Sequence, residues 1–351
     1  MHNPDSAARP IETVKKIDYR IIDFPHSLRR CMVEGLDHSF PKGDAQPQLI
    51  HVVLTRFNLP TGGREAPLRN QPDWLAKRFD LFERFCLPSM AAQTCQDFEW
   101  IIYFDDATPR EFRIRIKEDQ RIRRFHAMFL TTLDPHLGGK STYEFIGERA
   151  GAMLLTTKLD NDDSLSKHFV ARLQQTAVGH RGGTAFNFTN GYVLSGNRLY
   201  LHCHRSNAFV NFLEAYTPEA MTAIKFPHMQ LARNAVVVQL EEPRAWLQVV
   251  HGANVSNRTR GRLVAKKDLE DDLADFPASA ISEVVDPPWT EVLSGRLISE
   301  PLRASRDLAS GLVNKIGVAQ TLSDSLRAGQ NRLRGISTRQ KQQSLKESGH
   351  N

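Results

Sequence analysis

The chain has 351 residues, of which 40% are hydrophobic and 25% are charged, so it can bury a substantial core. These fractions exclude a wholly disordered protein, and the lack of any segment approaching the length of a membrane span argues against an integral membrane protein. The net charge of +6 is confined to residues 301–351, which hold nine Lys and Arg against three Asp and Glu. The neutral remainder lacks the interleaved basic and aromatic residues that bind single-stranded nucleic acid, so nucleic acid is not an expected partner.

The cysteines and the N-terminus indicate the compartment. Cys31, Cys86, Cys95 and Cys203 are scattered and form no C-x-x-C pair, which favours reduced thiols over a disulfide framework or a zinc site. The first ten residues, MHNPDSAARP, lack the basic segment and apolar core of a secretory signal. We therefore expect a cytoplasmic protein, with peripheral contact to the inner membrane face through the basic residues 301–351 as an additional hypothesis.

The first elements expected along the chain are a lead-in, a strand and a helix. Prolines interrupt residues 1–47, a strand is expected at Leu49–Thr55, and a polar loop follows at 61–72. Asp73 is predicted to be the N-cap of a helix, because an apolar stripe at helical spacing follows it. The stripe indicates a core-facing helix surface rather than a cofactor pocket, and its members are Trp74, Leu75, Phe79, Phe82, Phe85 and Cys86.

A second strand and a charged helix are expected next. Pro88 ends the first helix or starts another, and the segment FEWIIYFDD predicts a strand that ends at Asp105 and Asp106. Residues 110–125 predict an amphipathic helix that is rich in Arg and has a solvated face. A short helix at 141–151 leads to the central strand.

The central stretch is MLLTTKLDNDDS, residues 153–164, in which an apolar run ends in Asp160, Asp162 and Asp163. The run predicts a buried strand, and open α/β sheets bind their ligands at the carboxyl ends of strands. Three crowded carboxylates raise one another's pKa, and a hard divalent ion such as Mg²⁺ removes this conflict. The alternative is a solvated turn or a helix cap, which Asp and Asn also favour.

Beyond the acidic cluster, the pattern gives one helix and several strands. The helix is expected at 166–176, and the strands at 185–188, 191–195, 198–202, 235–240 and 246–250. Strands alternating with helices predict an α/β domain with a mostly parallel sheet, which we assign to residues 48–262. Residues 263–351 are expected to form a linker and a basic, helical and partly disordered tail.

Three of these segments together resemble the nucleotide-sugar glycosyltransferases with the A-type, Rossmann-like fold. HVVLTRFNLP resembles their first strand, LPSMAAQTCQDFEWIIYFDD their helix, turn and second strand, and LLTTKLDNDDSL their metal-binding D-x-D-D. With FNFTNGYVL and WLQVVHGANVSN, the ensemble is similar to the bacterial rhamnosyltransferase family over roughly residues 48–262. The resemblance implies transfer of a sugar, with rhamnose as a candidate, from a nucleoside-diphosphate sugar to a polysaccharide or lipid-linked acceptor.

The resemblance also implies roles for the acidic cluster and a late histidine. Asp160 would contact the ribose or a metal-bound water, and Asp162 would ligate Mn²⁺ or Mg²⁺ between the two phosphates. Asp163 would cap the following helix or orient its neighbours near the reacting groups. His251 is placed to complete the metal shell, although a lone histidine is more often a structural hydrogen-bonding residue.

Three further residues would bind the donor by the same resemblance. Asp105, at the end of the second strand, would contact the base or ribose, with Asp106 as its companion. Arg56, near the end of the first strand, would meet the base or a phosphate. A surface salt bridge explains Arg56 equally well.

The catalytic base is where the sequence departs from the family pattern. Inverting members carry an acidic E-D pair before an L-x-x-R segment, whereas the comparable stretch here reads FPHMQLARN. His228 is the candidate base, because the reference pKa of histidine lies near neutrality. Glu241 and Glu242 are alternatives, so the stereochemical outcome stays open.

Other polar residues are weaker candidates. Asn187, Thr189 and Asn190 could line the acceptor side, but Asn190-Gly191 is also a strong hairpin-turn signal. The run at 202–204, His-Cys-His, has metal-binding residue types, but adjacent strand positions face opposite sides of a sheet.

Two rival functions come from different classes. A nucleotidyltransferase or pyrophosphorylase shares the sheet but carries a Gly-rich loop after the first strand, of which Gly62-Gly63-Arg64 is a faint version. A non-enzymatic module that binds anionic surfaces through the basic tail is the other rival.

Overall fold

The computed structural model describes residues 47–60, 69, 71, 73–132, 137–226, 228–241, 244–251 and 259–294. The predicted lead-in, the Gly62-Gly63-Arg64 loop and the basic tail lie outside these residues. The chain divides into two compact units, and the first ends at Pro287. The described part of the second unit contains helix α11 (Trp289–Ser294).

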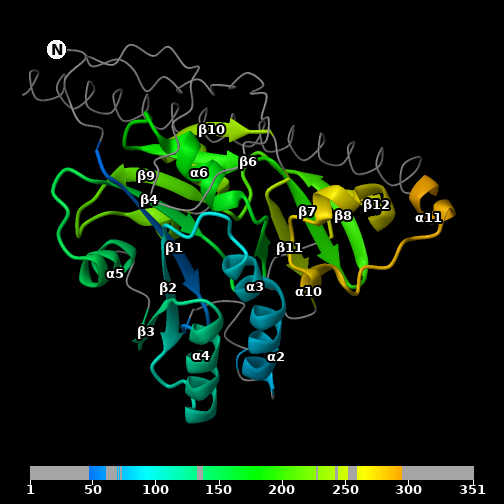
Figure 1. Ribbon diagram of the computed structural model, residues 1–351, viewed down its shortest axis with the longest axis horizontal. Helices are drawn as coiled ribbons and strands as arrows, with labels where there is room; N and C mark the ends of the chain where they lie inside the picture. The colour runs from blue at the N-terminus through cyan, green and yellow to red at the C-terminus, as the bar shows by residue number, and fades with distance from the viewer. Residues whose placement is uncertain are drawn as a thin grey trace, which may run out of the picture. The chain divides into compact units, whose positions relative to one another are not determined.

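The main sheet has seven described strands in the order β10-β6-β9-β4-β1-β2-β3 (Figure 1). Their bounds are β1 (Leu49–Arg56), β2 (Glu99–Asp105), β3 (His126–Leu130), β4 (Met153–Lys158), β6 (Thr184–Phe188), β9 (Asn211–Ala215) and β10 (Val236–Leu240). All neighbouring pairs are parallel except those of β9, which runs antiparallel between β4 and β6. The predicted α/β fold with a mostly parallel sheet is confirmed.

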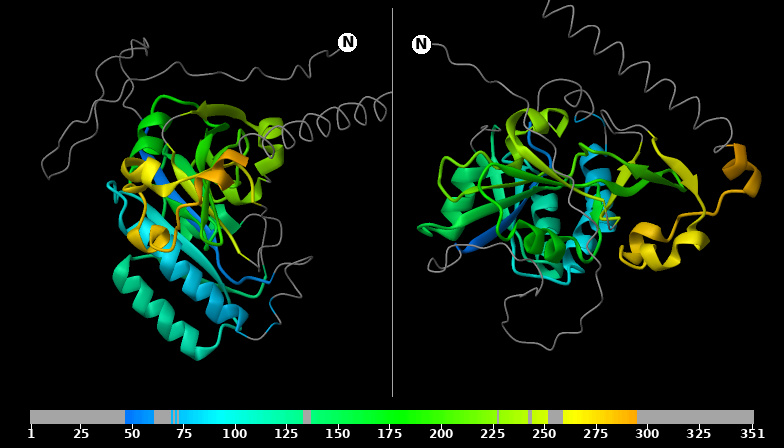
Figure 2. Two further views of the ribbon diagram at one scale, coloured as in Figure 1. Left: turned by 90° about the vertical axis from the view of Figure 1, so that its right-hand side faces the viewer. Right: turned by 90° about the horizontal axis from the view of Figure 1, so that it is seen from above.

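Helices cover both faces of this sheet, which explains why β1, β2 and β4 read as continuous apolar runs. One core joins the sheet to α2 (Trp74–Leu81), α3 (Leu87–Ala91), α4 (Arg110–Ile122) and α6 (Phe169–Ala177). The opposite core joins it to α5 (Leu137–Ile146) and α7 (Thr222–Lys225). Helices α2 and α4 lie side by side in both views (Figures 1 and 2). Both faces of the central strands β1, β2 and β4 are therefore buried.

Helix α2 and the turn after it carry the predicted apolar stripe, and Phe79 in α2 and Phe82 directly after it are fully buried. Asp73 occupies the predicted N-cap position, but its side chain does not cap the helix. Asp73 has a left-handed backbone, with φ of 60°, and its side chain makes no capping hydrogen bond. A π-helical turn at Phe82–Cys86 follows α2 and leads into α3, whose first turn contains Pro88. Proline has no N–H to donate to the carbonyl of the preceding helical turn, and its ring crowds that carbonyl. The wider π-helical turn just before Pro88 accommodates both effects.

A second sheet has the order β12-β8-β7-β11-β5 among the described residues. Its strands are β5 (Ser164–Leu165), β7 (Asn190–Ser195), β8 (Arg198–Cys203), β11 (Trp246–Val250) and β12 (Arg262–Val264). The predicted turn at Asn190-Gly191 is wrong, because both residues lie in β7. Strands β6 and β7 belong to different sheets, and the hairpin turn comes later, between β7 and β8, where Gly196 has φ of 59°.

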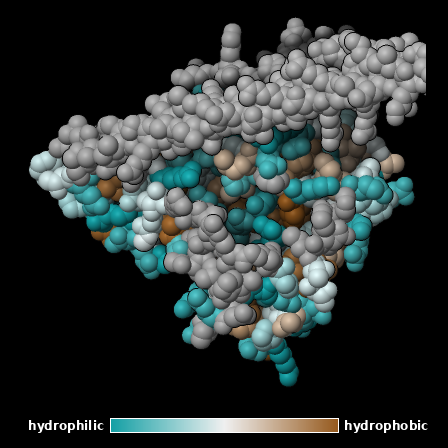
Figure 3. All heavy atoms as spheres, turned by 180° about the vertical axis from the view of Figure 1, so that it is seen from behind, coloured by the Kyte–Doolittle hydropathy of each residue, from teal (hydrophilic) through white to brown (hydrophobic). Residues whose placement is uncertain are grey.

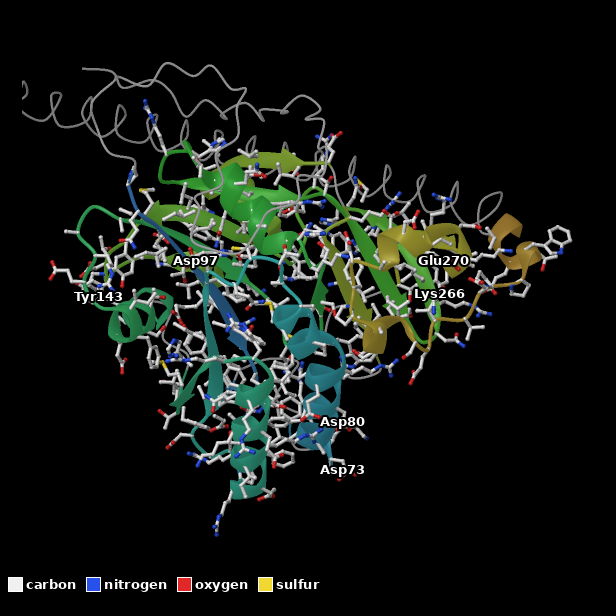
Figure 4. All side chains as sticks on the ribbon, in the orientation of Figure 1. Asp73, Asp80, Asp97, Tyr143, Lys266 and Glu270 are labelled. Atoms are coloured by element: carbon white, nitrogen blue, oxygen red, sulfur yellow. The ribbon has the colours of Figure 1, made fainter. Side chains whose placement is uncertain are left out.

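The first unit extends beyond residue 262, where the predicted domain ended. Strand β12 pairs with β8, and α9 (Glu270–Leu273) and α10 (Ala278–Ile281) supply buried side chains to the core of the second sheet. Lys266 and Glu270, labelled in Figure 4, begin the short helical segments that follow β12. The sequence predicts a linker and a tail over residues 263–351, because the apolar residues that follow Leu263 are widely spaced between charges.

The surface of the described residues is mixed in polarity. On the face drawn in Figure 3, hydrophobic residues are scattered among hydrophilic ones. Within the described ranges, no helix combines the length and the apolarity needed to cross a bilayer.

His51 on β1 is a buried neutral histidine, and it predicts an acid-sensitive fold. Its Nε2 lies 2.9 Å from Thr157 Oγ1, which donates its own proton to Asn211 Oδ1. Nε2 must therefore carry the imidazole proton, and Nδ1 accepts from Gln174 Nε2 at 3.3 Å. Burial lowers the pKa of His51 to about 3.

We expect acid to destabilise the protein through His51. Between pH 6.5 and 3 the unfolded chain binds a proton at His51 that the folded chain does not bind, so stability falls as pH falls. The loss between pH 6.5 and 5 should be about 2 kcal/mol. Urea unfolding at several pH values measures it, with His51→Gln as the variant that cannot titrate. Equal pH dependence of the two proteins would contradict the prediction.

Candidate active site

The predicted donor-binding residues lie at the carboxyl ends of three adjacent parallel strands. Arg56 ends β1, Asp105 ends β2, and the acidic turn that contains Asp160 and Asp162 follows β4. Because β4, β1 and β2 are neighbours in the sheet, these residues share one edge. Strand order thus brings together side chains that are far apart in the sequence.

The closest contact in this cluster joins the acidic turn to the late histidine. His251 Nε2 lies 2.8 Å from Asp162 Oδ2, and Arg78 Nη1 lies 3.5 Å from the same oxygen. The Asp162 side chain is only 7% exposed, so these contacts are shielded from water. A short strand pairing produces the contact, because β5 follows the acidic turn directly and pairs with β11, which His251 follows.

Asp160 lies in a positive environment. Its Oδ1 is 3.8 Å from Lys158 Nζ, and the side chain is 37% exposed. Burial alone would raise the pKa of Asp160, but the positive charges of Lys158, Arg56 and Arg78 outweigh it, and the pKa is lowered. Asp160 is therefore ionised at neutral pH and open to a ligand.

Asp163 is held inside the protein. It is 1% exposed, and its Oδ1 accepts a hydrogen bond of 2.8 Å from the backbone N–H of Val249 in β11. Burial raises the pKa of Asp163 well above the usual range, and the charges of Asp162 and Asp160 raise it further. This carboxyl group ties the acidic turn to β11, which fits the predicted orienting role better than contact with a reacting atom.

The two aspartates at the end of β2, Asp105 and Asp106, have different surroundings. Arg69 Nη2 donates to Asp105 Oδ2 at 2.6 Å, and the N–H of Ala107 donates to Asp105 Oδ1 at 2.8 Å. Asp106 is exposed and lies 3.5 Å from Arg113 of α4. The two neighbouring carboxylates thus meet different arginines, and Asp105 has the shorter and less exposed of the two contacts.

The candidate base lies within electrostatic range of Asp160. His228 is half-buried, and its pKa is lowered by burial and by the positive charges of Lys158 and His204, while Asp160 acts in the opposite direction. Its backbone oxygen accepts a hydrogen bond from Ser206 Oγ. Of the alternatives, Glu241 is exposed and lies 3.7 Å from Arg205, and Glu242 lies outside the described residues.

The candidates for the acceptor side are bonded within the protein. Asn187 Nδ2 donates to Gln239 Oε1 at 2.8 Å, and Thr189 Oγ1 donates to the Leu240 carbonyl at 3.2 Å. Asn190 Nδ2 donates to the backbone oxygen of Glu241. These three side chains connect β6 and β7 to β10 and to the residue that follows it. Their role is therefore structural.

Comparison with known proteins identifies the family. Residues 50–263 match the family described as "Putative rhamnosyl transferase". The chain belongs to this family. Its members are named as glycosyltransferases, which agrees with the resemblance carried by the strand ends and the acidic turn. No curated protein matches the chain.

Solved structures are similar to the chain only distantly. S. aureus TarS 1–349 in complex with UDP shares 13% identity over 57% of this chain and 60% of that chain, with a TM-score of 0.33. The inositol-1-phosphate CTP transferase from T. maritima shares 10% identity over 61% of this chain and 94% of that chain, with a TM-score of 0.29.

Asp162 and His251 are arranged as two ligands of a divalent ion would be. The carboxylate of Asp162 and the imidazole of His251 face each other, and two ligands of one ion lie at a similar separation. Within the described ranges, no three His, Cys, Asp or Glu side chains gather as a metal-binding group. Mg²⁺ commonly takes one or two protein ligands and fills its shell with water and substrate phosphates, so a two-ligand site is consistent with a bound donor.

Sequence reasoning missed the arginines around the cluster. Arg69 and Arg78 lie over the Trp74 ring, at 5.8 and 5.1 Å from its centroid, and contact Asp105 and Asp162. The signal that could have found Arg78 is its position four residues after Trp74, since residues at that spacing are neighbours on a helix. Arg69 had no such signal.

Proposed function

We propose that the chain is a metal-dependent glycosyltransferase that moves a sugar from a nucleoside-diphosphate sugar to a glycan or a lipid-linked acceptor, with rhamnose as the candidate sugar. The contact of Asp162 with His251 carries this proposal, because these two side chains would hold an ion where the strand ends gather the predicted donor-binding residues. Family membership supports the transfer of a sugar.

The donor would lie across the carboxyl ends of the strands. Asp105 would face its base or ribose, Arg56 a phosphate or the base, and Asp160 the ribose or a metal-bound water. Asp162 and His251 would hold Mn²⁺ or Mg²⁺, which when bound stabilises the negative charge of the departing diphosphate. Arg56 lies within electrostatic range of Asp160, which supports one continuous site.

His228 would accept the proton of the acceptor hydroxyl. Its lowered pKa keeps the imidazole neutral at physiological pH, so a nitrogen lone pair is available. The acceptor oxygen then bonds to the anomeric carbon, the bond from that carbon to the diphosphate oxygen breaks, and the diphosphate leaves with the electron pair. Asp160 lies close enough to influence His228, which supports placing the reacting carbon between them.

The proposal predicts that a nucleoside diphosphate stabilises the protein in a metal-dependent way. A ligand that binds only the folded state raises the melting temperature by mass action. Thermal shift with UDP, dTDP, GDP, CDP and ADP, each with and without Mn²⁺, should show a rise for one base that needs the metal. Asp162→Ala should abolish the rise, whereas Glu283→Gln, at an exposed position paired with Arg84, should keep it. No rise with any nucleotide would refute the proposed donor site.

A further inference from the structure

Contacts with Asn161 and Asp162 of the acidic turn, and with Trp74 of α2, hold Arg78 in place. Its Nη1 donates to Asn161 Oδ1 at 2.9 Å and lies 3.5 Å from Asp162 Oδ2. Its guanidinium carbon lies 5.1 Å from the centroid of the Trp74 ring. Trp74 is itself buried at the start of α2, so the aromatic surface under the guanidinium is fixed.

The Arg78 contact with Asp162 is the weakest of the three and is the one that a ligand would change. Asn161 and Trp74 hold the guanidinium whether or not Asp162 stays beside it. Asp162 Oδ2 has the shorter contact with His251, at 2.8 Å. Once Asp162 and His251 share a divalent ion, two positive groups lie side by side, and an anion between them relieves the repulsion.

Arginine suits that anion. The guanidinium is always charged, and its fork of N–H donors matches two phosphate oxygens at once. Its side chain is 13% exposed, so a contact with phosphate there is little weakened by water. The guanidinium carbon of Arg69 also lies over the Trp74 ring, 5.8 Å from its centroid, and Arg69 donates a hydrogen bond to Asp105. The two arginines therefore connect the predicted base or ribose contact with the predicted ion site.

We infer that Arg78 binds the diphosphate of the donor directly, and that Trp74 and Asn161 hold its guanidinium in place for this purpose. The inference rests on the proposed function, and it adds a phosphate-binding residue that comes from α2 rather than from a strand end. Arg78 contacts Asp162 and also lies within electrostatic range of Asp160. One guanidinium is therefore near both acidic residues that are predicted to act on the donor.

The test separates phosphate binding from folding. Isothermal titration with UDP and dTDP, and with the matching nucleosides uridine and thymidine, is carried out in Mn²⁺ and again in EDTA on wild type, Arg78→Gln and Arg78→Lys. Arg84→Gln is the matched control, because Arg84 lies on the same helical segment, is stacked on Phe85, and binds Ser279 and Glu283 instead of the acidic turn.

Arg78→Gln should lower the affinity for the nucleoside diphosphate by about tenfold to a hundredfold, which is the usual contribution of hydrogen bonds to a charged group. Affinity for the nucleoside should change less than threefold in Mn²⁺ and in EDTA alike, and the diphosphate affinity of Arg78→Lys should lie between those of wild type and Arg78→Gln. Arg84→Gln should bind like wild type.

Two results overturn the inference alone, provided that wild type binds UDP or dTDP. One is a diphosphate affinity for Arg78→Gln equal to that of wild type. The other is an equal loss of nucleoside and diphosphate affinity in both Arg78 variants, which would mean that Arg78 only shapes the fold. If wild type binds neither UDP nor dTDP, the titrations use whichever of GDP, CDP and ADP stabilises it, and if none does, the proposed function fails and this inference fails with it.

Discussion

Replacing Asp162 by asparagine is expected to lower the rate of sugar transfer by about a hundredfold to a thousandfold, the usual cost of losing one group that stabilises developing charge. The asparagine keeps the shape of the side chain but loses the charge that pairs with His251. Release of nucleoside diphosphate from the donor, followed as a function of Mn²⁺, measures the effect. Asp80→Asn is the control, because Asp80 lies on α2 and its partner is Arg115.

A double variant sharpens this prediction. If Asp162 and His251 hold one ion, the losses in Asp162→Asn and His251→Ala should not add, because either change alone already empties the same site. We expect the double variant to be no slower than the slower single variant. Additive losses would show that the two residues act separately, and activity of Asp162→Asn within threefold of wild type would refute the ion site.

Gly191→Ala is expected to lower the free energy of unfolding by about 2 to 3 kcal/mol, the upper part of the range for overpacked cores. A Cβ at residue 191 would lie 2.1 Å from Trp246 Cδ2. Trp246 cannot move away easily, because it is 1% exposed, stacks on Phe209 at 5.2 Å, and donates from Nε1 to the Phe188 carbonyl. Urea unfolding measures the change.

The matched control for this prediction is Gly182→Ala. A Cβ there would meet no atom closer than 3.6 Å, which is ordinary van der Waals contact. The control should unfold within about 1 kcal/mol of wild type, since a methyl group that fits without strain changes stability little. Equal stability of Gly191→Ala and wild type would mean that the indole shifts freely, against the packing described here.

The apolar pattern of the sequence located several strands of both sheets. Strand β11 is found at the residues expected, and β1, β2, β7 and β8 differ from expectation by a residue or two. Strands that helices bury on both faces must be apolar along their length, so they stand out from the chain without any knowledge of the fold.

Strands β3 and β9 were not foreseen. The burial of β3 is only intermediate along its length, because it is the edge strand of the main sheet, and β9 follows a polar turn. Strand β9 lies antiparallel between β4 and β6, and hydrogen bonds to these strands, which are distant in the sequence, determine that position. Local periodicity carries no information about which strand lies beside which.

Asn190-Gly191 shows the same limit at a single site. The pair has the composition of a hairpin turn, but the glycine is there because the Trp246 ring lies against its backbone. The two residues are 55 positions apart, and the register of β11 with β7 sets them opposite each other. A turn residue and a packing residue look alike until the partner strand is known.

The sequence by itself determined the fold class, the family resemblance and the acidic turn, because burial patterns and clustered carboxylates are local properties. Only the tertiary structure decided what surrounds that turn. The pairing of β5 with β11 brings His251 to Asp162, and helix α2 carries Arg78 to the same carboxylate. Contacts between distant segments depend on strand order and helix packing, and no local pattern of residues encodes those directly.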